Sequence, residues 1–146
     1  MRAYVDTSVL GALFLPEIDS ARAAELVQRM KEPLIFTPLH RLELRNTIRL
    51  AVLRRRITAV QATAALHKQE SHERAGLFVP VTPMWNDVYA RADRLSGDYS
   101  AQFGCRTLDI LHVAAALTFG VREFFTFDQD QARLARAVGL RVLPTV

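Results

Sequence analysis

The segment Arg106–Leu117, RTLDILHVAAAL, decides how the rest of the chain is interpreted. Almost every residue after Asp109 is apolar, so the segment predicts a helix that is buried on at least one face. Thr107 is placed to cap this helix, and Asp109 then falls within its first turn. A buried carboxylate is costly unless it is paired or neutralised. Asp109 therefore needs a partner, a function or both.

Outward from this helix, short β-rich runs alternate with helical segments. One helix is expected over about 39–54, and Thr58–Gln61 has the pattern of a capping box that starts the next helix. Strands are expected at Arg2–Val5, Leu34–Thr37, Phe78–Val81, Glu123–Phe127 and Leu140–Leu143. This alternation predicts an α/β fold with a mostly parallel sheet covered by helices on both faces. No linker or repeat interrupts the chain, so residues 1–146 are expected to form a single domain.

Composition narrows the classes of function. The formal net charge is +4, and the basic residues comprise 17 Arg but only two Lys, Lys31 and Lys68. Arginine forks suit phosphate groups, although an arginine-rich genome explains the same bias. One cysteine, Cys105, excludes a disulfide framework and a cysteine-based zinc cluster within the chain. No signal peptide is recognised, and no apolar run approaches the ~20 residues of a membrane helix, so a cytoplasmic protein is expected.

Four acids share a placement at the ends of strands or the starts of helices. Asp6 follows the first predicted strand, and Asp128 follows the fourth. Glu43 lies near the start of the helix after the second strand, and Asp109 lies in the first turn of the buried helix. Binding sites of open α/β sheets lie outside the carboxyl ends of the strands, so these side chains are expected to converge.

Each acid also has a structural explanation. Asp6 and Asp128 can cap helices, and Glu43 can pair with a neighbouring arginine. Asp130, in the same turn as Asp128, suits compensation of the helix dipole. Carboxylates brought together repel one another, and a divalent cation relieves that repulsion. Oxygen ligands favour Mg²⁺ or Mn²⁺, which suit phosphodiester hydrolysis by an activated water.

Basic residues supply a second pattern. Arg41, Arg45 and Arg49 recur every four residues on the Glu43 helix, and Arg54–Arg56 ends it. This face either follows a nucleic-acid backbone or is simply solvated. His112, one turn after Asp109, is interpreted mainly as a core histidine, with hydrogen bonding near the site as the alternative.

Four segments together resemble the PIN domain, most closely the VapC-type toxins of bacterial toxin–antitoxin pairs. They are YVDTSVLGALFLPE near the start, RLELRNTIRLAVLRR after the second strand, RTLDILHVAAAL, and FFTFDQDQARLARAVGLRVLP near the end. The resemblance covers nearly the whole chain. It implies a three-layer α/β/α sandwich with a central, mostly parallel sheet.

The resemblance also implies a function. Asp6, Glu43, Asp109 and Asp128 match the family's acids, so they are expected to be both catalytic residues and metal ligands, with Asp130 as the alternative fourth acid. Family members are Mg²⁺- or Mn²⁺-dependent endoribonucleases. They usually form homodimers and are silenced by a small cognate antitoxin of the VapB kind. The RNA substrate, its cleavage sequence and the number of metal ions stay open.

Other functions remain as alternatives. A non-catalytic RNA-binding or antitoxin-binding protein of this fold is one, and a DNA-directed nuclease is another. A haloacid-dehalogenase-like phosphatase is disfavoured because Ser8 stands where its second acid is needed. A receiver domain is disfavoured because no lysine follows Lys68.

Overall fold

Five short strands, all paired in parallel, form the β structure of the computed structural model, which describes residues 3–145. The strands fall into two hydrogen-bonded groups, and the chain folds into two compact units. Unit 1 combines residues 1–6 with 82–146, and unit 2 comprises 7–81. The predicted strand Arg2–Val5 is observed from Ala3 to Val5, and Arg2 lies outside the described residues.

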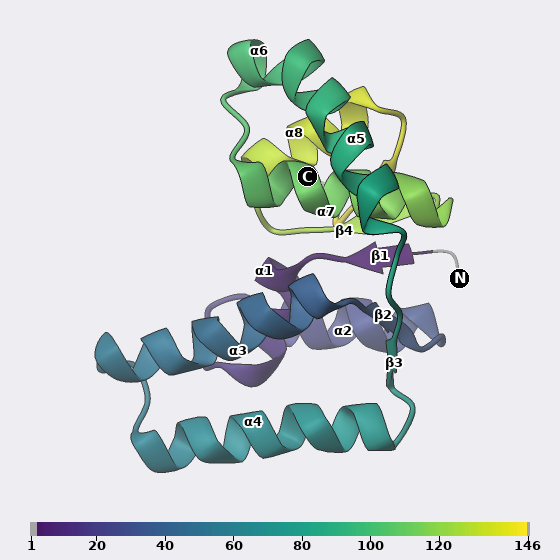
Figure 1. Ribbon diagram of the computed structural model, residues 1–146. Helices are drawn as coiled ribbons and strands as arrows, with labels where there is room; N and C mark the ends of the chain where they lie inside the picture. The colour runs from purple at the N-terminus through teal and green to yellow at the C-terminus, as the bar shows by residue number, and fades with distance from the viewer. Residues whose placement is uncertain (1–2, 146) are drawn as a thin grey trace. The chain divides into compact units, whose positions relative to one another are not determined.

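Unit 1 contains a three-stranded sheet in the order β1-β4-β5, so β4 is the central strand. Helices α5, α7 and α8 accompany this sheet, and α5 packs against α7 (Figure 1). Its elements, in chain order, are β1 (Ala3–Val5), α5 (Trp85–Leu95), a π-helical turn (Ser96–Ser100), α6 (Ala101–Phe103), α7 (Thr107–Phe119), β4 (Glu123–Phe125), α8 (Gln129–Ala137) and β5 (Arg141–Leu143).

The core of unit 1 joins β1, β4 and α7. Tyr4 and Phe124 are fully buried, and their rings stack with centroids 5.5 Å apart. The Tyr4 hydroxyl and Nδ1 of His112 lie 2.8 Å apart in a buried hydrogen bond. The interpretation of His112 as a core histidine is confirmed, because its side chain is only 1% exposed. The bond links α7 to the strand that ends at Asp6.

Unit 2 contains the β2–β3 pair and four helices, of which α3 packs against β2 and α4 against β3. Helices α3 and α4 lie side by side as a hairpin (Figure 1). Its elements, in chain order, are α1 (Thr7–Phe14), α2 (Ser20–Met30), β2 (Leu34–Phe36), α3 (Pro38–Leu53), α4 (Ala59–Arg74) and β3 (Phe78–Pro80). The capping box predicted at Thr58 is confirmed: its hydroxyl accepts from Gln61 N, and the Gln61 side chain accepts from Thr58 N.

The start of α7 differs from the sequence prediction. Arg106, not Thr107, is the N-cap residue, and its side chain makes no capping bond. Thr107 is the first residue within the helix. The prediction of a Thr107 cap is therefore wrong by one residue. The shift gives Arg106 extended backbone angles immediately before the helix, with Asp109 three residues further on.

Candidate active site

Asp6 lies at the carboxyl end of β1, where the parallel register aligns it with the end of β4. Val5 pairs with Phe125, and the backbone N–H of Asp6 donates to the carbonyl of Phe125 over 2.9 Å. Thr126 directly follows β4, and its hydroxyl donates a hydrogen bond to Oδ2 of Asp6 over 2.9 Å. The Asp6 side chain is thus buried, at 5% exposure, and one of its oxygens accepts a hydrogen bond from the Thr126 hydroxyl.

Thr126 also fixes the start of α8. Its hydroxyl accepts from the backbone N–H of Asp128 over 3.0 Å, while Oδ1 of Asp128 accepts from Gln131 N over 3.0 Å. The predicted role of Asp128 as a helix cap is confirmed by that second bond. This cap uses Oδ1 of Asp128, and Oδ2 has a different side chain as its partner.

Arg106 is that partner, and it joins Asp128 to Asp109. Its Nη2 lies 2.9 Å from Oδ2 of Asp128, and its Nε lies 3.2 Å from Oδ2 of Asp109. The Asp109 side chain is only 13% exposed, whereas that of Arg106 is 73% exposed. Sequence reasoning did not single out Arg106. The only available signal was its spacing of three residues before Asp109 at a helix start.

The charges of these acids are coupled. Burial raises the pKa of Asp109 above its ordinary value, and the negative charge of Asp128 raises it further. The contact with Arg106 lowers it in part, and the charge of Asp6 adds to the upward shift. Three carboxylates of unit 1 therefore share one end of the sheet and repel one another.

The contacts separate Asp128 from Asp130, the two predicted candidates for the fourth acid. Asp128 is half-buried and shares Arg106 with Asp109, whereas the Asp130 side chain is exposed on α8. Asp130 acts on another group: after burial and Asp109, its charge contributes to raising the pKa of Cys105. The contacts therefore favour Asp128 as the partner of Asp109.

Glu43 belongs to unit 2, on the second turn of α3. Its Oε1 accepts from the hydroxyl of Thr7 over 3.0 Å, and the side chain is half-buried. Within unit 1, Arg106 joins Asp109 to Asp128, and the charge of Asp6 acts on Asp109. In unit 2, Glu43 is bonded to Thr7, the residue after Asp6 in the sequence.

The donor set has the chemistry of a hard-cation site. Carboxylate oxygens are the ligands that Mg²⁺ and Mn²⁺ prefer, and the mutual repulsion at Asp109 is the condition that such a cation relieves. Within residues 3–145, no three or more His, Cys, Asp or Glu side chains are gathered closely enough to hold an ion. The acids therefore fit a divalent cation in type and charge, and Arg106 spans two of them.

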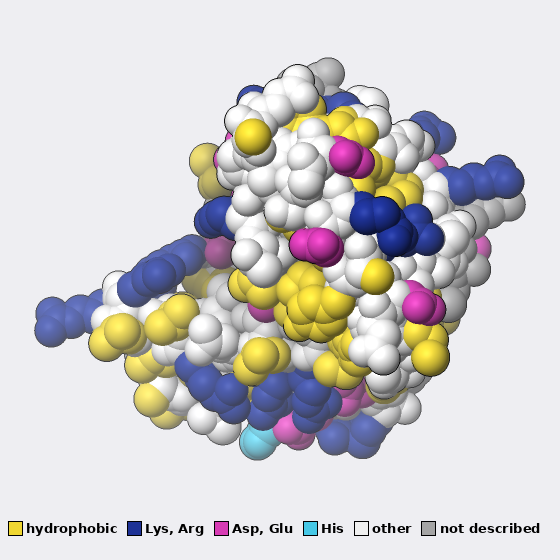
Figure 2. Space-filling view, turned by 45° about the horizontal axis from the view of Figure 1, so that its top comes forward, with side chains coloured by type: hydrophobic (Ala, Val, Ile, Leu, Met, Phe, Trp, Pro, Cys, Tyr) yellow, Lys and Arg dark blue, Asp and Glu magenta, His cyan; other side chains and the backbone are white. Residues whose placement is uncertain are grey.

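The predicted arginine face of α3 is largely used within unit 2. Nη1 of Arg41 lies 2.8 and 2.9 Å from the two carboxylate oxygens of Glu73 on α4. Nη1 of Arg45 lies 2.8 Å from Oε1 of Gln69 and 3.5 Å from Glu70. Two of the three arginines therefore hold the α3–α4 hairpin together. Elsewhere, Figure 2 shows Lys and Arg side chains in several separate groups with exposed hydrophobic side chains between them.

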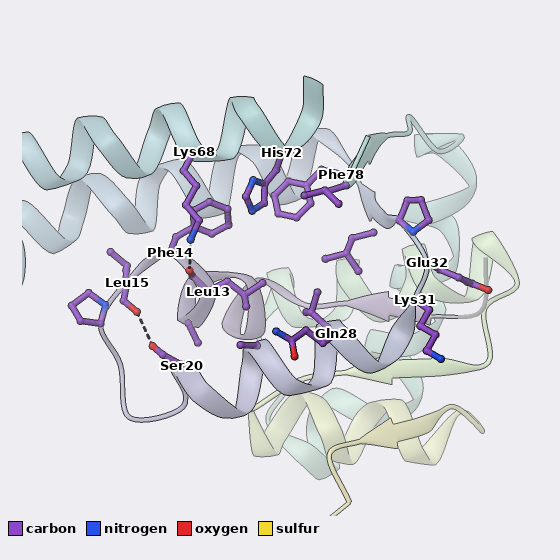
Figure 3. Close-up of a pocket in the computed structure, with 17 residues that line it drawn as sticks. Leu13, Phe14, Leu15, Ser20, Gln28, Lys31, Glu32, Lys68, His72 and Phe78 are labelled. Carbon is purple, nitrogen blue, oxygen red and sulfur yellow. Dashed lines mark hydrogen bonds between the residues drawn. The ribbon is translucent and has the colours of Figure 1, made fainter. Parts of the chain in front are cut away.

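A cavity of about 850 Å³ lies in unit 2 and contains none of the predicted acids. Lys68, His72 and Phe78 line one wall, and Gln28 of α2 lies across from them (Figure 3). Burial lowers the pKa of His72, and the nearby charge of Lys68 lowers it further. The lining is mainly apolar, which does not suit a phosphodiester, so this cavity is not a candidate for RNA hydrolysis.

Comparison with known proteins agrees with this architecture. A family model described as the PIN domain matches residues 3–137. The solved structure of VapC20 from Mycobacterium tuberculosis, described as a Sarcin-Ricin loop cleaving toxin, is 18% identical. It has a TM-score of 0.67 and covers 94% of this chain and 95% of that one. FitAcB from Neisseria gonorrhoeae is 17% identical, with a TM-score of 0.69 and coverage of 96% and 95%.

At these identities the structural likeness concerns the fold. No curated protein matches the chain in sequence. The predicted α/β/α fold with parallel strands is confirmed by the family match and by the solved structures. Among residues 3–145, no helix combines the length and apolarity needed to cross a membrane.

Proposed function

The chain belongs to the PIN-domain family, and from that premise we propose that it is a Mg²⁺- or Mn²⁺-dependent endoribonuclease, the toxin of a toxin–antitoxin pair. PIN domains are nucleases, and both solved neighbours have this fold. The observation that supports the proposal is the set of contacts at the carboxyl ends of β1 and β4: Arg106 joins Asp109 to Asp128, and Thr126 contacts both Asp6 and Asp128. The two units together would form one PIN domain, since the family model runs across both.

The proposed roles follow from the contacts. Asp6 and Asp109 would hold the cation most directly, with Glu43 and Asp128 as further ligands, partly through water. When bound, Mg²⁺ or Mn²⁺ would supply Lewis-acid polarisation of the phosphate and an activated water. Thr126 keeps the Asp6 carboxylate oriented, and the N-terminus of α7 stabilises the negative charge of Asp109. In-line attack leaves a 5′-phosphate and a 3′-hydroxyl.

Partners are part of the proposal. Exposed apolar side chains and the apolar cavity of unit 2 support contact with another protein. In unit 2 the large exposed apolar residues are Ile18, Leu42, Leu53, Val60, Leu77 and Val79. A VapB-like antitoxin and a second copy of the chain are the proposed protein partners, RNA is the substrate, and the cytoplasm is the proposed location.

Cleavage of RNA by single-carboxylate variants tests the function. Purified protein is incubated with total cellular RNA and Mn²⁺, and the fragment ends are sequenced. Asp6→Asn and Asp109→Asn should each lower the cleavage rate by about a hundredfold or more, because each removes a charged cation ligand. Glu43→Gln should lower it less, about tenfold, since it keeps the hydrogen bond from Thr7.

Asp87→Asn is the matched control. Asp87 also stands in the first turn of a helix of unit 1, α5, but its side chain is exposed. The Asp87→Asn variant should cleave RNA at the parental rate. Parental cleavage by Asp6→Asn or Asp109→Asn would refute the assigned site. No cation-dependent cleavage of RNA by the parent, combined with RNA or antitoxin binding, would favour a non-catalytic protein, and cleavage of DNA alone would favour a DNA-directed nuclease.

A further inference from the structure

Arg106 engages two of the proposed cation ligands at the same time. Its Nε and Nη2 reach Oδ2 of Asp109 and Oδ2 of Asp128 over 3.2 and 2.9 Å. The planar guanidinium can do this because its nitrogens form a rigid fork. The positive charge of Arg106 therefore partly neutralises the carboxylates of Asp109 and Asp128. Carboxylate oxygens are also the ligands that a hard cation prefers.

The contact of Arg106 with the two carboxylates is expected to be reversible. The Arg106 side chain is 73% exposed, and exposed ion pairs are individually weak because water screens them. Asp128, by contrast, is held by the backbone, since its Oδ1 accepts from Gln131 N at the start of α8, and Asp109 belongs to the first turn of α7 with its side chain only 13% exposed. The arginine can therefore rotate into solvent without breaking the bond that holds Asp128 at the start of α8.

We propose that Arg106 is a tethered competitor of the divalent cation: it occupies Asp109 and Asp128 in the cation-free protein and sets the cation concentration at which the site fills. This inference rests on the proposed function, because it takes these two acids as cation ligands. The opposite role is that the arginine holds the two carboxylates in a geometry that helps the cation bind. The two roles predict changes of opposite sign when Arg106 is replaced.

Direct measurement of Mn²⁺ binding to the RNA-free protein distinguishes them. The variant Arg106→Gln is titrated with Mn²⁺, and free Mn²⁺ is measured by electron paramagnetic resonance. Its dissociation constant should fall about three- to tenfold, the scale expected for removing weak exposed ion pairs. The rise in melting temperature on adding Mn²⁺ should also be larger than in the parent, since the cation binds the variant more tightly.

Arg141→Gln is the matched control for the change in net charge. Arg141 is 71% exposed and pairs with Glu123 over 3.4 Å. Glu123 begins β4, so this ion pair lies at the other end of the strand from Asp128 in the same unit. Arg141→Gln should bind Mn²⁺ like the parent. Arg106→Lys keeps the charge but loses the fork that spans two carboxylates, so its affinity should fall between those of the parent and Arg106→Gln.

Unchanged or weaker Mn²⁺ binding by Arg106→Gln overturns the inference, as does an equal gain in Arg141→Gln. Should Arg106→Gln fail to fold, as judged by circular dichroism, parental affinity in Arg106→Lys overturns it instead. Binding by the parent that is lost in Asp109→Asn, together with no gain in Arg106→Gln, leaves the proposed function standing and removes only the role of Arg106. Parental Mn²⁺ binding that persists in Asp109→Asn overturns both.

Discussion

Helices α7 and α3 each carry a predicted site acid near the start, but their charges are compensated in different ways. In α7, Asp109 is followed by a nearly continuous buried segment, and its cation comes from the exposed residue just before the helix. In α3, Oε1 of Glu43 accepts from the Thr7 hydroxyl, and two arginines of the helix, Arg41 and Arg45, pair with α4. All of these ion pairs involve partly exposed side chains and are individually weak. They differ in what they join: the α3 arginines connect two helices, whereas Arg106 connects two of the predicted site acids.

The same contrast appears in the two buried histidines. His112 of α7 is bonded to Tyr4, which lies 108 residues away in sequence. His40 of α3 is bonded to Thr37, three residues away, as part of a capping box. The first contact fixes α7 against β1, the strand that precedes Asp6. The second shapes the start of its own helix, and the His40 ring also stacks on Phe36 of β2. Mutations in these contacts should separate tertiary from local stabilisation.

The largest effect is expected from His112→Ala. It removes a fully buried ring and one partner of the Tyr4 hydroxyl. We expect a loss of about 2–4 kcal/mol in the free energy of unfolding, from the cavity and the broken bond. Urea denaturation followed by circular dichroism measures it. His67→Ala, at an exposed position of α4, is the control. Equal midpoints for the two variants would show that His112 does not anchor α7.

A smaller effect is expected from Thr37→Val. The Thr37 hydroxyl lies 2.8 Å from Nδ1 of His40 and accepts from His40 N, and the side chain is only 1% exposed. Loss of this cap should cost about 1 kcal/mol, measured by the same denaturation. Thr58→Val removes the exposed cap of α4 and should cost less. A larger loss for Thr58→Val would contradict the importance given to burial.

The elements themselves could largely be predicted from the sequence. Apolar periodicity and β-rich runs are local signals, and α7 or the strand at Phe78–Pro80 differs from its prediction by only a residue or so. The π-helical turn and the short helix α6 over Ser96–Phe103 are not predicted from the sequence, since the residues SGDYSAQF show no clear apolar period. The α/β class followed from the order of elements, which does not depend on exact boundaries.

The site was predictable only in part. The rule that strand ends meet at one edge places Asp6 beside Thr126 and Asp128, as the contacts in unit 1 show. The destinations of long arginine side chains are not local properties. Arg106 reaches Asp128 across 22 residues, and Arg41 reaches Glu73 across 32. Such pairs depend on how helices are packed, which residue spacing along one helix does not reveal.

Asp109→Asn should change how stability depends on pH in the cation-free protein. The pKa of Asp109 is raised in the folded state, first by burial and then by Asp128. Its contribution to stability is therefore fully present below its unfolded pKa and is lost as pH rises through the raised folded pKa. Asparagine cannot ionise, so the variant should gain stability over the parent across that interval.

This effect is measured by chemical denaturation at several pH values with a chelator present. Asp87→Asn changes an exposed acid of the same unit and serves as the control. Parallel stability curves for the parent and Asp109→Asn would mean that ionising Asp109 costs the fold nothing. A gain in stability for Asp109→Asn at higher pH would instead show that α7 retains a destabilising charge, which folding alone does not explain.

The smallest effect is expected for the bidentate pair between Arg41 and Glu73, whose side chains are 46% and 18% exposed. A double-mutant cycle of Arg41→Gln and Glu73→Gln should give a coupling energy of about 0.2–1 kcal/mol, falling with added salt. Thermal and urea denaturation of the four proteins measure it. A coupling energy near zero would mean that Glu73 does not hold Arg41, so that the arginine is available to RNA. A coupling within the expected range means that the arginine must first leave α4 before it can bind a phosphate, so its net contribution to RNA affinity is reduced by that energy.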